Sequence, residues 1–198
     1  MIKAIIFDCH GVLTIEGTFD FLIQQYSLKY GKSMEGLSQT VRQYWDLAKV
    51  DKIHSTQFWE RVADFLNYNS QALRREWIEH FGFRPAILPL IKKLKWKYKT
   101  ALLTNDVRDW LEELSAVYSL PSYFDVILPS YEAKVAKPDS AIFRRLLQDL
   151  HCNAEECIYI DDLEKNITAA RALGFNVIHF SSMEDLNEKL QEQDIMIT

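Results

Sequence analysis

The chain has 198 residues, of which 48% are hydrophobic and 26% charged, and its formal net charge at pH 7 is −5. These values are ordinary for a globular protein of one domain, or of one domain with a modest insertion, and the acidic balance disfavours a general nucleic-acid binder. The three cysteines, Cys9, Cys152 and Cys157, have no CxxC spacing, and no segment is apolar for long enough to be a signal peptide or a membrane span. We therefore expect a cytoplasmic protein that binds neither nucleic acid nor membranes.

Short apolar runs alternate with segments of helical periodicity along most of the chain. The runs are rich in β-type residues and have the character of strands that are covered on both faces; they span residues 3–8, 100–106, 124–130, 157–162 and 175–180. Helices are predicted for residues 86–98, 107–119, 138–150, 164–173 and 182–193, with Pro138 in a first turn and Ser181 and Glu184 as a capping box. This order predicts the α/β class, with a Rossmann-like parallel sheet and right-handed crossovers.

Residues 18–84 contain no convincing strand. Apolar side chains recur there at helical spacing, and turn residues interrupt them near Gly31, Gly36, Asp51 and Asn67–Ser70. We therefore predict an inserted four-helix cap at 18–84, with the α/β core formed by 1–17 and 85–198. The cap region is rich in aromatic residues, which either build its core or line a pocket facing the sheet.

Polar residues follow the predicted strands where a parallel sheet binds its ligands, at the carboxyl ends. They are Asp8, Thr104, Asn105, Asp161 and Asp162, and Lys137 follows the third strand. Each one alone is also a common helix cap or turn residue, but all of them should reach one edge of the sheet. Converging carboxylates repel each other unless a cation is present, and hard oxygen ligands suit Mg²⁺. A hydroxyl, a lysine and free N–H groups would bind a phosphate.

The order of these residues resembles the four motifs of the haloacid dehalogenase (HAD) superfamily. The motifs stand here as "DCHGVLT", "LLTN", "AKPDSAIF" and "IDDLEKNITAARALG", and the helical insertion resembles the family's C1 cap. The resemblance covers nearly the whole chain and implies the HAD fold. Within the family, the acidic pair followed by Asn is similar to sugar-phosphate phosphatases and to the phosphatase domain of soluble epoxide hydrolases. One fold hosts many chemistries, so the substrate is not implied.

The resemblance also implies a role for each matching residue. Asp8 corresponds to the nucleophile that forms an aspartyl-phosphate, and Lys137 to the residue that neutralises charge on both nucleophile and phosphate. Thr104 and the N–H of Asn105 would bind the phosphate. Mg²⁺ would be held by Asp8, the backbone carbonyl of His10 and Asp162. Asp161 would be a weaker ligand or would orient the ligands, and Asn166 would bind a metal-bound water or orient the ligands. The implied partner is a small phosphorylated metabolite.

His10 departs from the family pattern, in which phosphatases carry an acid/base Asp at this position. A histidine can donate and accept protons near neutrality, so it could replace that Asp. Alternatively, the site binds Mg²⁺ and phosphate or a phosphoprotein but turns over slowly or not at all. A third reading is a metal-independent haloacid dehalogenase, and phosphomutase or phosphonate-cleaving chemistry is a fourth. Cys9 and His179 are expected to serve packing.

Overall fold

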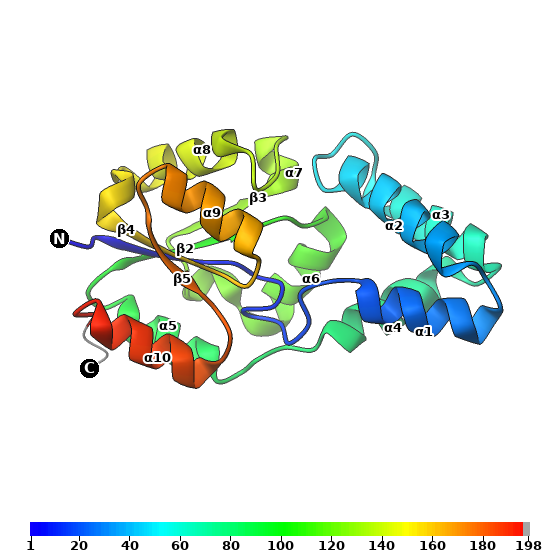
Figure 1. Ribbon diagram of the computed structural model, residues 1–198, viewed down its shortest axis with the longest axis horizontal. Helices are drawn as coiled ribbons and strands as arrows, with labels where there is room; N and C mark the ends of the chain where they lie inside the picture. Colours follow the sequence, from blue (N-terminus) through cyan, green and yellow to red (C-terminus); the bar gives the residue numbers. More distant parts are fainter. Residues whose placement is uncertain (196–198) are drawn as a thin grey trace.

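The computed structural model describes residues 1–195 and is built around a parallel five-stranded sheet (Figure 1). The strand order is β3-β2-β1-β4-β5, with every neighbouring pair parallel. The strands are β1 (Ala4–Phe7), β2 (Lys99–Thr104), β3 (Val126–Pro129), β4 (Cys157–Asp161) and β5 (Asn176–His179). Each lies within a segment predicted as a strand or starts one residue before it, which confirms the α/β prediction. β1 occupies the centre, so the residue after it reaches the middle of the sheet's carboxyl edge.

Two separate apolar clusters cover the faces of the sheet. Alternate residues of β1 divide between them, with Ile5 and Phe7 in one cluster and Ala4 and Ile6 in the other. The first face is covered by α5 (Ile87–Leu94), α6 (Arg108–Tyr118) and α10 (Met183–Glu192), and the second by α8 (Ser140–Leu150) and α9 (Glu164–Ala172). Burial on both faces explains why the strands are apolar without alternation.

Four helices are inserted between β1 and α5 and lie to one side of the sheet (Figure 1). They are α1 (Asp20–Tyr30), α2 (Met34–Ala48), α3 (Ser55–Leu66) and α4 (Ser70–Phe81). Left-handed residues at Gly31 and Asn67 end α1 and α3, as the turn signals predicted. The predicted break at Gly36 is wrong, because Gly36 lies in the first turn of α2 and its N–H donates to the N-cap Ser33.

Ion pairs join the inserted helices to the rest of the chain at two places. Arg74 of α4 donates to the carboxylates of Asp109 and Glu113 on α6, at 2.7 and 2.6 Å. Asp51, in the loop after α2, pairs with Lys134, which follows the short helix α7 (Ser130–Ala133). The insertion is therefore attached to the segments that follow β2 and β3.

Local details differ from the predictions at two helix starts and at several short elements. Ser182, one residue later than expected, caps α10 by accepting from the N–H of Asp185. Pro138 precedes α8, whose N-cap is Asp139, rather than lying in its first turn. Helix α7 and the short 3₁₀ segments Leu120–Ser122 and Ala154–Glu156 are too short to produce a periodic pattern. Among the helices of residues 1–195, none has the length and apolarity needed to cross a bilayer.

Candidate active site

The central element of the site is the carboxylate of Asp8, directly after β1. The N–H of Asp8 donates to the carbonyl of Ile160, which continues the β1–β4 pairing and holds the backbone in place. Its Oδ1 accepts from the N–H of Cys9 at 2.6 Å and lies 2.6 Å from Nζ of Lys137. Burial raises the pKa of Asp8 well above its usual value, and the charge of Lys137 acts in the opposite direction. The strand end therefore presents a buried carboxylate whose ionisation depends on nearby positive charge.

Lys137 links Asp8 to a second carboxylate, that of Asp161 at the end of β4. Its Nζ lies 2.8 Å from Oδ2 of Asp161, and its side chain is only 1% exposed. Burial alone would lower the pKa of Lys137, but the negative charges of Asp161 and Asp8 raise it. The lysine is thus held as a cation between the ends of two neighbouring strands.

Asp161 makes its contacts with protein groups. Besides Lys137, it accepts from the hydroxyl of Tyr159, from Nδ2 of Asn166 at 3.0 and 3.1 Å, and from the N–H of Leu163 at 2.8 Å. Although burial acts to raise its pKa, Lys137 and these donors hold the value below the usual range. Asp161 is therefore an ionised, fully hydrogen-bonded support for Lys137. Tyr159 was not singled out by the sequence analysis, because it lies inside an apolar strand.

Asp162 differs from Asp161 in both its hydrogen bonding and the direction of its pKa shift. Its Oδ1 is buried and has no hydrogen-bond partner among residues 1–195. Burial, followed by the charge of Asp161, raises the pKa of Asp162 to about 6. A Cβ at Gly11 or Gly17 would lie 2.2 or 2.3 Å from Oδ2, so only glycine leaves space for this carboxylate.

Carboxylate oxygens of Asp8, Asp161 and Asp162 all lie within 4.8 Å of one another. Because Asp161 is already occupied by donors, Asp8 and Asp162 are the two carboxylates with oxygen atoms to offer an ion. The unpartnered Oδ1 of Asp162 and the hard oxygen donors fit a divalent cation. His179 is not a packing residue as expected: it is exposed, and its Nε2 donates to the backbone carbonyl of Asp162 at 2.8 Å.

The residues after β2 contribute an open hydroxyl and a brace for Lys137. Oγ1 of Thr104 is buried and lacks a hydrogen-bond partner within residues 1–195. The side chain of Asn105 donates to the carbonyl of Lys137 at 2.9 Å and accepts from its N–H at 2.8 Å. This reciprocal pair fixes the backbone from which the lysine extends. The side chain of Asn105 thus has a positioning role that its motif does not indicate.

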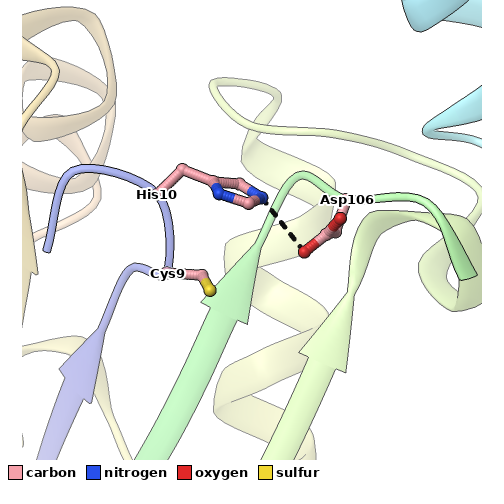
Figure 2. A group of neighbouring side chains, drawn as sticks. All are labelled: Cys9, His10 and Asp106. Carbon is pink, nitrogen blue, oxygen red and sulfur yellow. Dashed lines mark hydrogen bonds and ion pairs between the residues drawn. The ribbon is translucent and has the colours of Figure 1, made fainter. Parts of the chain in front are cut away.

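His10 lies at the same edge but binds a residue that the sequence analysis did not select. Nε2 of His10 is 3.1 Å from Oδ2 of Asp106, which is completely buried just beyond β2 (Figure 2). The predicted strand 100–106 included Asp106, whereas β2 ends at Thr104, so Asp106 lies in the loop beyond the strand. The only sequence signal was a carboxylate directly after the Thr–Asn pair.

Cys9 lies beside this pair and is fully buried, in line with its expected packing role. Ligand atoms of Cys9, His10 and Asp106 fall within 4.8 Å of one another (Figure 2). Burial raises the pKa of the Cys9 thiol well above its usual value, so the thiolate that binds metals is disfavoured. The group fits a hydrogen-bonded His–Asp pair beside a packed thiol better than a metal centre.

A cavity of about 430 Å³ opens next to Asp8 and His10, between the sheet edge and the inserted helices. Its apolar wall includes Phe19, Trp45, Phe81 and Trp110, whose rings contact one another at centroid distances of 4.7–6.2 Å. The cationic residues Arg42, Lys49 and Lys165 also line it. The aromatic residues of the insertion therefore serve both roles considered for them, since others, such as Phe58 and Trp77, are buried in its core.

Two curated relatives of similar length are phosphatases. The chain is 25% identical to D-ribitol-5-phosphate phosphatase of Bacteroides thetaiotaomicron, covering 96% of this chain and 97% of that protein. It is 25% identical to the phosphorylated carbohydrates phosphatase of Thermotoga maritima over 89% of this chain and 84% of that protein. The first curated relatives are much larger, and the chain spans only 10% to 18% of their length.

Solved structures share the fold across nearly the whole chain. A HAD family enzyme of Bacteroides thetaiotaomicron, in complex with magnesium and inorganic phosphate, superposes with a TM-score of 0.78 at 23% identity, covering 96% of this chain and 99% of that one. The family model for haloacid dehalogenase-like hydrolases matches residues 2–174. The sheet order, the motif residues at its carboxyl edge and this match agree, and the chain belongs to the haloacid dehalogenase-like hydrolase family.

Proposed function

We propose that this hydrolase is a Mg²⁺-dependent phosphatase that acts on a small phosphorylated metabolite through an aspartyl-phosphate on Asp8. The observation that carries the proposal is the ion pair of Asp8 with Lys137, beside two buried oxygens, Oγ1 of Thr104 and Oδ1 of Asp162, that lack partners within residues 1–195. Such oxygens are costly to bury unless a ligand completes them. The phosphatase names of two relatives of similar length support the same activity.

Asp8, the backbone carbonyl of His10 and Asp162 would hold the Mg²⁺ ion. The fit rests on hard oxygen donors and on the space that Gly11 and Gly17 leave for the Asp162 carboxylate. When bound, the ion supplies positive charge that offsets the repulsion between these carboxylates and a phosphate. Asp161 would not bind the ion directly but would fix the positions of Lys137 and Asn166, to which it is hydrogen-bonded.

The residues of the chain supply the steps of hydrolysis. Asp8 attacks phosphorus and displaces the leaving-group oxygen, while His10 gives that oxygen a proton. Lys137, the hydroxyl of Thr104 and the N–H of Asn105 bind the phosphoryl oxygens as charge builds on them. A water molecule then cleaves the aspartyl-phosphate and returns a proton to His10, which releases phosphate and restores Asp8.

The inserted helices would select the substrate. We propose that residues 18–84 act as a cap over the core formed by 1–17 and 85–198, because the cavity lies between them and includes Phe19 and Trp45. A volume of about 430 Å³ is in the range of small-molecule sites and suits a compact phosphomonoester.

One observation favours a second candidate, a phosphate-binding protein with little or no turnover. Nε2 of His10 is already engaged by Asp106, so this atom cannot serve a substrate without breaking the bond. A haloacid dehalogenase is less consistent with the site, because metal-independent chemistry would leave the open Oδ1 of Asp162 without a role.

The test is hydrolysis of p-nitrophenyl phosphate and of a panel of sugar and polyol phosphates, with Mg²⁺ or with EDTA. Wild type should be active only with Mg²⁺, and Asp8→Asn should lose activity by several orders of magnitude. Asp139→Asn is the matched control, because Asn also caps a helix and Asp139 only caps α8. When the aspartyl-phosphate is trapped and the protein is digested, the phosphoryl group should be found on the peptide residue Asp8.

Two results would contradict the proposal. Activity that persists in Asp8→Asn would remove Asp8 as nucleophile. Phosphate binding without any turnover across the panel would favour the second candidate, and fluoride release from fluoroacetate in EDTA would favour the dehalogenase.

A further inference from the structure

Asp106 is a buried carboxylate for which the proposed phosphate and metal chemistry has no use. Its side chain is completely buried, and its backbone N–H donates to Oγ of Ser130 at 3.1 Å. Oδ1 accepts from the N–H of Val107 at 2.8 Å, and Oδ2 faces Nε2 of His10 at 3.1 Å. The carboxylate is therefore fixed in place, and it offers one acceptor directly to the imidazole of His10.

The pairing follows from the sheet register. Phe7 of β1 lies opposite Leu102 of the parallel strand β2, so the segments that leave these two strands run beside each other. His10 and Asp106 are 96 residues apart in sequence, yet they meet at this edge (Figure 2). The contact thus joins two segments that both belong to the α/β core.

The ring of His10 is also held by aromatic neighbours. Its centroid lies 4.6 Å from that of Trp110 and 5.4 Å from that of Phe81, with the Phe81 ring at 75° to it. Turning the ring away would break the bond to Asp106 and leave Oδ2 of this buried carboxylate without a donor, which is costly. A single orientation of the imidazole is therefore favoured.

This orientation decides which nitrogen is free. A carboxylate can only accept, so Nε2 must donate to Asp106, and in the neutral ring the lone pair then lies on Nδ1. Nδ1 is buried and has no hydrogen-bond partner among residues 1–195, and the residue His10 lines the cavity together with Asp8. Nδ1 is therefore the nitrogen available for proton exchange.

We infer that Asp106 is a positioning residue that holds His10 in its Nε2–H form and directs Nδ1 to the proton transfers of the reaction. The inference rests on the proposed phosphatase function. In the first half of the reaction, Nδ1 of the imidazolium gives its proton to the leaving-group oxygen, which leaves the neutral Nε2–H form. In the second half, Nδ1 takes a proton from the attacking water, which restores the imidazolium. Asp106 keeps its bond to Nε2 throughout, so His10 carries out the role that an aspartate has in relatives of the family.

The tautomer can be observed without activity, by ¹⁵N NMR of the histidine side chains at a pH where the imidazole is neutral. Wild type should show Nε2–H for His10. In Asp106→Asn this preference should weaken or reverse, because the amide can donate to Nε2. The signals of His54, His80, His151 and His179 should not move. An Nδ1–H form in wild type, or an unchanged form in Asp106→Asn, would overturn the inference even if the protein hydrolyses phosphates.

Kinetics separate positioning from a structural role. Asp106→Asn should lower kcat by roughly 10²–10⁴-fold, the usual contribution of a positioned acid–base group, with little change in KM. In a His10→Asn background, the same change should alter kcat less than about twofold, because residues that act as a unit are not additive. Glu112→Gln, on the exposed side of α6, is the control and should match wild type.

Equal losses in both backgrounds would assign Asp106 to structure and overturn the inference. If wild type hydrolyses none of the phosphates, the proposed function fails, whereas the NMR result still decides whether Asp106 sets the tautomer of His10. The two failures are therefore distinguishable.

Discussion

Replacing Lys137 by methionine tests how much of the site's charge is compensated internally. The side chain of Lys137 is 1% exposed and lies between Asp8 and Asp161, so Lys137→Met leaves two buried carboxylates without their cation. Removing one partner of a buried ion pair costs about 3–5 kcal/mol of unfolding free energy. We expect a loss of this size at pH 7.5 in urea unfolding with EDTA.

The loss should depend on pH in a defined direction. In wild type the pKa of Asp161 lies below its ordinary value of 3.8, so its stabilising contribution is complete above that value and is lost only as pH falls through the lower folded value. Without Lys137, burial still acts to raise the pKa of Asp161 and the largest opposing charge is gone, so the ionised carboxyl should cost stability as pH increases. The penalty should therefore shrink between pH 7.5 and pH 4.5.

Lys134→Met is the matched control for this substitution. Lys134 also pairs with an aspartate, Asp51, but its side chain is 57% exposed. Exposed pairs contribute about 0–1 kcal/mol, so this variant should lose little and show no comparable pH dependence. A penalty below about 1 kcal/mol for Lys137→Met, or one that is equal at both pH values, would refute the reasoning from a buried, charge-dependent network.

Three further outcomes follow from the same geometry. Because the pKa of Asp162 is raised to about 6, Mg²⁺ affinity measured by calorimetry should be nearly constant above pH 7 and weaken as pH falls below 6. Gly17→Ala should weaken Mg²⁺ binding about tenfold or more, because the added Cβ would displace the Asp162 carboxylate. This is the usual loss when a group that orients a metal ligand is changed, and unchanged affinity would contradict the contact. Arg74→Met should lower unfolding stability by about 1 kcal/mol and raise the rate of proteolysis in the α4–α5 connection, since it removes the half-buried pairs to Asp109 and Glu113.

The sheet could be predicted from sequence because burial on both faces leaves an unambiguous signal. Runs such as "AIIF" and "CIYID" are continuously apolar and end in polar residues, which marks both the strand and its functional end. Short elements carry no such signal: α7 has four residues, fewer than two helical turns. The choice between Ser181 and Ser182 as the cap of α10 depends on backbone angles that neither serine reveals in sequence.

Site residues at the ends of strands could be predicted from the sequence. The residues that hydrogen-bond to them could not. Asp8 directly follows β1 and Asp161 ends β4, but Tyr159 resembles any apolar strand residue until its hydroxyl is seen on Asp161. Asp106 follows Thr104 and Asn105, where a carboxylate is commonly a helix cap. Its role depends on the direction of one side chain toward another that is 96 residues away, which spacing does not encode.

The His10–Asp106 pair changes what a return to the family pattern would do. His10→Asp would restore the usual aspartate, but it would also place a second carboxylate in a pocket that already holds the completely buried Asp106. Two nearby carboxylates in an apolar environment cannot both stay ionised at low cost, so one pKa must rise.

We therefore expect His10→Asp alone to be less active and less stable than the double variant His10→Asp with Asp106→Asn. Asn at position 106 removes the negative charge that repels the new carboxylate, and its amide can donate a hydrogen bond to that carboxylate. The measurements are kcat with Mg²⁺ and urea unfolding for the two variants. If the single variant equals or exceeds the double variant in both, residue 10 acts independently of Asp106, and the substitution in this chain needed no compensating partner.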